Sequence, residues 1–143
     1  MAGGLFIHSY NESSERYAIL DEFEKTGVLY LSEKGSQKPQ KDAFAYMQTL
    51  PIDKEVWKER MRAGEPPTLH TEIASNQAVI TNTRKEDFSF KWSISGEAVA
   101  LLYKGNPIAF IDLNEKYGFS KAVIAESPIV NPWDNMLYEK IFK

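Results

Sequence analysis

The sequence predicts an α+β fold, in which an antiparallel β-meander sheet packs against short helices within a single domain spanning residues 1–143. Apolar and polar residues alternate in residues 88–94, and short turns separate this run from further β-rich runs up to residue 125. Residues 53–62 and the C-terminal segment instead space their apolar residues as helices do. With 143 residues, 43% of them hydrophobic, the chain is large and apolar enough to bury one core.

The N-terminal part is expected to contain strands. LFIHSY, residues 5–10, is a strand candidate. Residues 17–32 allow two interpretations: a hairpin, in which YAILDEF and VLYLSE flank the turn EKTG, or a helix, in which Tyr17, Leu20 and Phe23 share one face. The hairpin is favoured because VLYLS has the β-rich composition of a strand.

Two helices are expected next, over residues 40–48 and residues 53–62. The second begins after Asp53, a good N-cap residue, and carries a narrow apolar stripe surrounded by charges. Gly64, followed by Pro66 and Pro67, should end this helix. After it, LHTEIA and QAVIT are short strand candidates.

The C-terminal half is predicted to form a meander of four strands. The strands are FSFKWSI (88–94), EAVALLY (97–103), IAFIDL (108–113) and FSKAVIA (119–125). The turns between them are too short for parallel crossovers, so successive strands should pair antiparallel. EAVALLY and IAFIDL are apolar on both faces, which predicts a central position in the sheet with helices over the second face.

The last segment, SPIVNPWDNMLYEKIFK, is predicted to form a short helix that packs on this sheet. Asn131 is a good N-cap residue and Pro132 is a good first helical residue. Trp133, Leu137 and Ile141 can share one apolar stripe along the helix.

Composition excludes several kinds of chemistry. The chain has no cysteine, which rules out disulfides, thiolate nucleophiles and thiolate zinc sites, and fits a cytoplasmic location. Its two histidines cannot form a three-histidine metal site within one chain. Neither a P-loop nor a G-x-G-x-x-G motif is present to cradle a nucleotide phosphate. We therefore expect no metal and no cofactor.

Neither a membrane nor a nucleic acid is an expected partner. The first residues lack the positively charged start of a secretory signal, and no run reaches the ~18 apolar residues that a membrane span needs. The net charge is −3, and the basic side chains of residues 53–62 alternate with acidic ones. Nucleic-acid-binding proteins usually present a clearly basic face instead.

Two features favour a non-catalytic protein that binds another protein. Residues 1–34 contain six acidic and three basic residues, and this excess favours a basic partner. Two tryptophans lie in expected helices beside loops, and tryptophan is enriched at interface hot spots, although it is also common at core edges. The candidate binding residues are Glu12, Glu15, Asp21, Glu22, Glu24, Trp57 and Trp133. One concrete version is a bacterial immunity-type inhibitor, a small acidic α+β protein that covers the site of a toxin.

The alternative is a small-ligand-binding protein or a hydrolase-like enzyme with a pocket between the sheet and the helices. Its candidate residues are His70, Glu72, Asp112 and Ser120. His70 and Glu72 stand two residues apart on an expected strand, which would place an imidazole beside a carboxylate. Ser120 lies in GFSKA, where Ala122 replaces the second glycine of a G-x-S-x-G elbow. Because these motifs are incomplete, catalysis is less expected than binding.

A third hypothesis is an oligomerising module. The expected sheet edges LFIHSY and FSKAVIA offer backbone groups that a second copy of the chain could pair with, which would give a homodimer.

Overall fold

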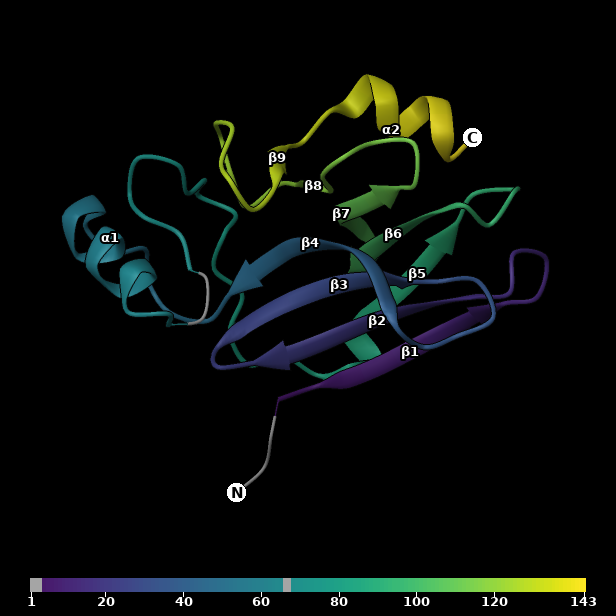
Figure 1. The fold of residues 1–143 in the computed structure, drawn as a ribbon, viewed down its shortest axis with the longest axis horizontal. Coiled ribbons are helices and arrows are strands. Elements are labelled where there is room, and N and C mark those ends of the chain that lie inside the picture. Colours follow the sequence, from purple (N-terminus) through teal and green to yellow (C-terminus); the bar gives the residue numbers. More distant parts are fainter. Residues whose placement is uncertain (1–3, 66–67) are drawn as a thin grey trace.

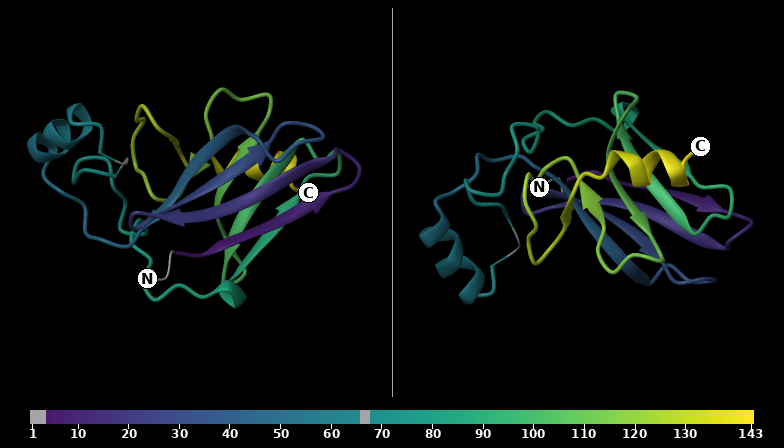
Figure 2. Two further views of the ribbon diagram at one scale, coloured as in Figure 1. Left: turned by 60° about the horizontal axis from the view of Figure 1, so that its bottom comes forward. Right: turned by 90° about the horizontal axis from the view of Figure 1, so that it is seen from above.

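Two β-sheets pack face to face in the computed structural model, which describes residues 4–65 and 68–143 (Figure 1). The first sheet comes from the N-terminal third of the chain and the second from the C-terminal half. Two short helices complete this α+β architecture, one at the periphery and one on the outside of the second sheet (Figures 1 and 2). The predicted helix stop at Pro66 and Pro67 lies outside the described residues.

The first sheet is a four-stranded antiparallel meander in the order β1-β2-β3-β4. Its strands are β1 (Phe6–Asn11), β2 (Arg16–Phe23), β3 (Thr26–Ser32) and β4 (Pro39–Met47). The strand predicted at residues 5–10 and the hairpin favoured over residues 17–32 are both confirmed. Glu24 and Lys25 form the hairpin turn with φ of 54° and 68°, and a type I′ turn requires positive φ at both positions.

The helix predicted over residues 40–48 is wrong, because this segment is strand β4. Its Ala, Lys, Gln and Met residues favour a helix when considered locally. In the folded chain, however, residues 43–47 are all buried, with a sheet on one side and loop residues such as Ile129 on the other. A strand covered on both faces loses its alternating pattern, so its apolar run cannot be distinguished from a buried helix by periodicity.

Gly27 in β3 leaves the space that the ring of Tyr46 in β4 fills. A Cβ atom at Gly27 would collide with that ring, which is fully buried. We expect Gly27→Ala to lower the free energy of unfolding by about 1–3 kcal/mol, because the ring or the strands must shift to relieve the overlap. Urea denaturation measures this loss.

A double variant separates this collision from other effects of Gly27→Ala. If the collision is the cause, adding Tyr46→Leu to Gly27→Ala should cost less than the sum of the two single changes, because the smaller side chain no longer meets the new methyl group. Additive losses would contradict the explanation.

The second sheet has the strand order β5-β6-β7-β8-β9. After a short 3₁₀ helix, η1 (Lys85–Asp87), it contains β5 (Phe88–Trp92), β6 (Ala98–Tyr103), β7 (Asn106–Asp112), β8 (Phe119–Ser120) and β9 (Asn131–Pro132). The predicted meander is confirmed through β7, and β6 and β7 occupy interior positions as their apolar sequences predicted. The last pair, β8 and β9, is parallel.

Some predicted strands are shorter than expected or missing. Only Phe119–Ser120 of FSKAVIA belongs to the sheet. After β8 the chain leaves β7 and runs beside the loop that contains Ser75. There the Ser75 N–H donates to the Ala122 carbonyl at 2.8 Å. LHTEIA and QAVIT, predicted as strands, hold only isolated β-bridges, which pair His70 with Ile52, Ala74 with Val123 and Val79 with Met47.

The main core lies between the two sheets. Its fully buried side chains include Leu20, Leu29 and Leu31 from the first sheet and Val99, Leu101 and Ile111 from the second. The first sheet therefore covers one face of the β6–β7 pair, which the sequence did not predict. The other face of this pair is covered by a helix, as predicted.

That covering helix is α2 (Asn135–Ile141), and it packs on the second sheet through an aromatic cluster around Phe110. It begins later than predicted. Asn131 and Pro132 form β9 instead of the helix start, and the Asn131 N–H donates to the Gly118 carbonyl at 2.8 Å. Asp134 is the N-cap, because its side chain accepts the Leu137 N–H at 3.0 Å.

The other helix, α1 (Lys54–Arg62), confirms the prediction over residues 53–62. The Asp53 side chain caps it by accepting the Glu55 N–H at 3.0 Å. None of its residues is buried, so α1 stands beside the sheets rather than over them (Figure 1). No helix in the described ranges has the length and apolar character needed to cross a membrane.

Candidate functional site

The side of the first sheet that faces away from the second sheet is rich in aromatic residues. Side chains alternate along a strand, so every second residue points to this side. Strand pairing aligns these residues, for example Phe6 opposite Asp21 and Tyr30 opposite Asp42. We call this surface the outer face, and its members are Phe6, His8, Tyr10, Tyr17, Ile19, Asp21, Phe23, Val28, Tyr30, Asp42 and Phe44.

Several aromatic side chains of the outer face are open to solvent. Phe6 is 55% exposed, Tyr10 47% and Phe23 65%. Tyr10 packs against Tyr17 with ring centroids 4.8 Å apart, and His8 approaches the same ring edge-on at 6.2 Å. Within residues 4–65 and 68–143, neither helix lies over this sheet face (Figures 1 and 2). The sheet thus presents an uncovered aromatic surface, a feature typical of interaction sites.

Two carboxylates lie near Tyr30 on the outer face. The members of this face include two carboxylates, Asp21 and Asp42, and no Lys or Arg. Burial raises the pKa of Tyr30, and the charges of Asp42 and Asp21 raise it further. Asp42 as a whole is exposed, yet the partial burial of its carboxyl raises its pKa above the usual range.

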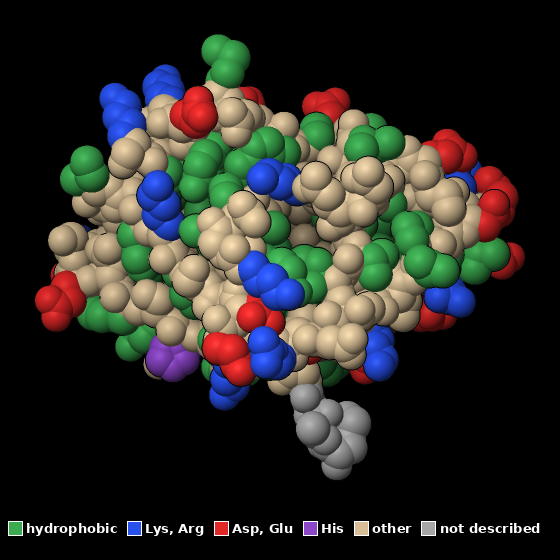
Figure 3. All heavy atoms as spheres, turned by 180° about the vertical axis from the view of Figure 1, so that it is seen from behind, with side chains coloured by type: hydrophobic (Ala, Val, Ile, Leu, Met, Phe, Trp, Pro, Cys, Tyr) green, Lys and Arg blue, Asp and Glu red, His purple; other side chains and the backbone are tan. Residues whose placement is uncertain are grey.

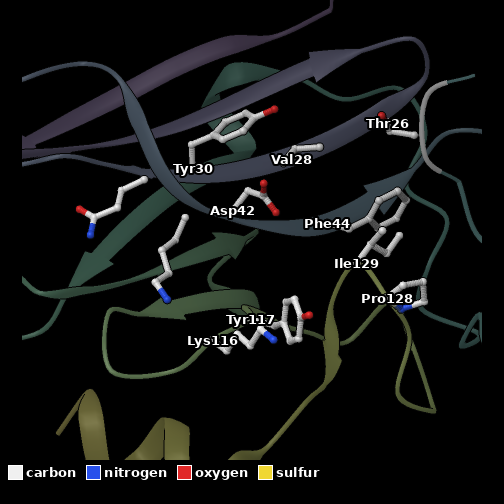
Figure 4. Close-up of a pocket in the computed structure, with 11 residues that line it drawn as sticks. Thr26, Val28, Tyr30, Asp42, Phe44, Lys116, Tyr117, Pro128 and Ile129 are labelled. Atoms are coloured by element: carbon white, nitrogen blue, oxygen red, sulfur yellow. The ribbon is translucent and has the colours of Figure 1, made fainter. Parts of the chain in front are cut away.

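A pocket of about 500 Å³ opens beside Tyr30, and we call it the Tyr30 pocket (Figure 4). One wall comes from β3 and β4, and the other comes from two loops of the C-terminal half. The lining residues are Thr26, Val28, Tyr30, Gln40, Lys41, Asp42 and Phe44 on the sheet side and Lys116, Tyr117, Pro128 and Ile129 on the loop side. Its volume lies within the roughly 300–1,000 Å³ that is typical of ligand sites, and its walls combine apolar and aromatic side chains with three charged ones, Lys41, Asp42 and Lys116.

The acidic residues predicted as a binding patch are divided between different places. Glu12 and Glu15 are exposed in the turn between β1 and β2, and Glu24 is exposed in the turn between β2 and β3. Asp21 is half-buried on the outer face, opposite Phe6. Acidic groups therefore lie on the outer face and in the turns at both ends of β2, rather than in one cluster.

Glu22 is buried and does not contribute to the acidic surface. Its Oε2 atom accepts the Tyr46 hydroxyl at 2.6 Å and the Thr83 hydroxyl at 2.7 Å, and its Oε1 atom accepts the Leu5 N–H at 3.3 Å. Burial, followed by this hydrogen bond to Glu22, raises the pKa of Tyr46 strongly. Glu22 thus joins three separate parts of the chain and has a structural role.

Both tryptophans of the predicted binding surface lie away from the outer face. Trp57 packs edge-on against His70 with centroids 4.8 Å apart, and its indole N–H donates to the Thr68 carbonyl at 2.8 Å. Trp133 packs edge-on against Phe110 at 5.2 Å, and the Lys121 ammonium lies 4.7 Å from the Trp133 ring centroid. Burial lowers the pKa of Lys121 there.

His70 and Glu72 do not form the predicted imidazole–carboxylate pair. They belong to a turn in which the Nδ1 atom of His70 accepts the backbone N–H of Glu72 at 3.2 Å. The Glu72 carboxylate instead lies 3.5 Å from the Lys54 ammonium on the surface. The alternation that suggested one strand face is therefore not realised.

Ser120 and Asp112 also make local contacts. The Ser120 hydroxyl, fully buried, donates to the Ala45 carbonyl at 3.5 Å and accepts the Ala122 N–H at 3.0 Å. The Asp112 carboxylate accepts the Asn114 N–H at 3.2 Å and stabilises the turn after β7. These contacts give both residues a structural explanation.

Charged groups are mixed rather than segregated by sign on the face seen in Figure 3, where Lys and Arg alternate with Asp and Glu. On α1, for example, the Lys58 ammonium lies 3.7 Å from the Glu55 carboxylate. In the described part of the chain, no three His, Asp or Glu side chains are grouped so that they could hold a metal ion.

The outer face was not predicted as a site from the sequence. Phe6, His8 and Tyr10 do alternate with smaller residues in β1, and this alternation was a detectable signal for one aromatic side of a strand. Tyr30, Asp42 and Tyr117 come from distant segments, so only the folded chain brings them to one pocket.

No family model matches the chain, and neither a curated protein nor a solved structure matches it significantly. The function must therefore be argued from the residues themselves.

Proposed function

We propose that this chain is a non-catalytic protein that binds another protein through the outer face. The observation that carries the proposal is the uncovered aromatic surface formed by Phe6, Tyr10 and Phe23. Aromatic side chains supply a large contact area, lose little conformational entropy and dominate interface hot spots. The antiparallel sheet holds them in place before a partner arrives, which lowers the entropic cost of binding.

A basic partner suits this surface best. Asp21 and Asp42 lie among the aromatic residues, and Glu12, Glu15 and Glu24 lie exposed in adjacent turns. Complementary charge of this kind accelerates encounter and disfavours acidic competitors. An immunity-type inhibitor that covers a basic toxin is the most specific version of this proposal.

A second candidate function, binding of a small ligand, is favoured by one observation. The Tyr30 pocket, at about 500 Å³, has room for a small organic molecule. A saturable rise in Tm with small molecules, in the absence of any protein partner, would support this candidate over the first.

The test of the first proposal is a double substitution on the outer face. Phe6→Ser together with Phe23→Ser is expected to weaken binding of the purified partner by about 30-fold or more, because two exposed aromatic anchors are lost. Isothermal titration calorimetry with a partner first captured by affinity purification measures the change in Kd. For an immunity-type inhibitor, the same variant should also fail to suppress the activity of the toxin.

The matched control is Ile94→Ser together with Met136→Ser. These side chains are 93% and 85% exposed, but Ile94 lies in the turn before β6 and Met136 lies on α2. The control is expected to bind as the unchanged protein does. Equal loss in both double variants, or full binding by the Phe6→Ser/Phe23→Ser variant, would contradict the proposal. If the partner is a second copy, light scattering should show a dimer that only the outer-face variant dissociates.

A further inference from the structure

The Asp42 carboxylate in the Tyr30 pocket has no cationic partner. Among the ion pairs of the described residues, none involves Asp42 or its neighbour on the outer face, Asp21. Asp42 stands directly across the strands from Tyr30, so the carboxylate and the phenol ring share one wall of the pocket (Figure 4). A partly buried carboxylate without an ion-pair partner is stabilised in its charged form by a nearby cation.

The two lysines that line the pocket are engaged elsewhere. The Lys41 ammonium donates to the Glu115 carbonyl at 2.7 Å. The Lys116 ammonium lies 5.3 Å from the centroid of its neighbour Tyr117, within the range of a cation–π interaction. Both lysines line the same pocket as Asp42, but neither forms an ion pair with its carboxylate.

We infer that the Tyr30 pocket binds the guanidinium group of an arginine side chain on the protein partner, with Asp42 as its counter-charge and the rings of Tyr30 and Tyr117 as its aromatic contacts. This inference rests on the proposed function, because it names the group through which a basic partner is recognised. The pocket is continuous with the outer face, since Val28, Tyr30, Asp42 and Phe44 belong to both.

Arginine fits these walls better than other side chains do. Its planar group stacks on aromatic rings and pairs with a carboxylate through parallel hydrogen bonds, whereas the lysine ammonium is a compact and strongly hydrated charge. The apolar part of the arginine side chain can lie against Pro128, Ile129 and Phe44 on the pocket walls. A neutral side chain of the same shape would use the apolar walls but leave Asp42 without a counter-charge.

Two small probes test the inference without the partner. Backbone ¹H–¹⁵N spectra of the full chain are recorded during titration with N-acetyl-arginine methylamide and, separately, with N-acetyl-citrulline methylamide, its neutral isostere. We expect saturable shifts at the amides of Tyr30, Asp42 and Tyr117 with the arginine probe, and at least about tenfold weaker binding of the citrulline probe. Equal binding of the two probes, shifts that map elsewhere, or no saturable shift with either would overturn the inference.

Three variants locate the effect. Asp42→Asn should lower the affinity for the arginine probe about tenfold, because it removes the counter-charge. The residue is exposed, so the substitution should leave the fold unchanged. Tyr117→Leu should lower the affinity for the arginine probe about threefold, because the aromatic contact is lost. Glu59→Gln, which removes an exposed charge on α1, should leave it unchanged. An unchanged Asp42→Asn variant would overturn the inference.

The experiments distinguish failure of the outer-face interface from failure of the arginine site in the Tyr30 pocket. If the arginine probe does not bind but the partner still depends on Phe6 and Phe23, the outer face is an interface that does not use arginine in this pocket. If the probe binds but the Phe6→Ser/Phe23→Ser variant binds the partner with unchanged affinity, the pocket recognises a cation and the proposed interface is wrong.

Discussion

Phe110→Ala should lower the free energy of unfolding by about 3–5 kcal/mol, the largest loss that we expect for a single change in this protein. Phe110 is fully buried on the outside of the second sheet. Its ring stacks on Phe119 at 4.7 Å and meets Trp133 at 5.2 Å and Phe142 at 5.8 Å. Alanine would leave a cavity at the centre of this aromatic cluster, beneath α2.

The measurement is urea denaturation followed by tryptophan fluorescence, with the m-value compared between variants. Phe23→Ala is the matched control, since the same ring is removed from a side chain that is 65% exposed, and its effect should stay within about 0.5 kcal/mol. A loss below about 1 kcal/mol for Phe110→Ala would show that the cluster does not hold α2 on the sheet.

Tyr46→Phe is expected to lower the free energy of unfolding by about 1–3 kcal/mol. The substitution removes only the hydroxyl that donates to the Glu22 carboxylate at 2.6 Å. Glu22 is 7% exposed, so water cannot easily replace this donor, and the carboxylate keeps only Thr83 and the Leu5 N–H. A hydrogen bond to a buried charged group is worth more than one between neutral groups.

Two further variants test this explanation by the same denaturation experiment. Tyr10→Phe removes the same atom from a side chain that is 47% exposed and should change stability by less than about 0.5 kcal/mol. Adding Glu22→Gln to Tyr46→Phe should recover part of the loss, since a buried neutral amide needs less compensation than a buried carboxylate. A Tyr46→Phe variant as stable as the unchanged protein would contradict a structural role for Glu22.

The buried Glu22 also changes how the acidic N-terminal segment is understood. In the sequence it is one of several acids and cannot be separated from Asp21, its direct neighbour. In β2 the two side chains point to opposite faces, so Glu22 enters the core and Asp21 remains on the outer face. The acidic charge that a partner meets is therefore smaller than the count of acids suggests.

The placement of α2 explains why the outer face is available. The helix α2 covers the second sheet, and α1 stands at the periphery. In the described part of the chain, therefore, no helix covers the aromatic residues of β1 and β2. The sheets cover each other on their inner sides. Among the described residues, the outer face is open at Phe6, Tyr10 and Phe23, and this is the surface on which we place the partner.

The strength of the local signal decided which elements were predictable. Strict alternation in residues 88–94 and the doubly apolar β6 and β7 predicted the antiparallel order β5-β6-β7 of the second sheet correctly, and capping chemistry predicted the start of α1 at Asp53. Where burial is set by distant segments, the local signal failed. Residues 40–48 contain helix-forming residues but became β4, because pairing with β3 and cover on both faces outweigh propensity.

By itself, the sequence determined the α+β class, the central meander, the N-terminal hairpin and the absence of cysteine chemistry, since these depend on composition and on patterns within a few residues. Only the tertiary structure decided that two sheets face each other, that Glu22 is buried, and that Tyr30, Asp42 and Tyr117 line one pocket. The physical reason is that a local pattern fixes which side of a strand is apolar, but the contacts between distant segments decide what covers each side.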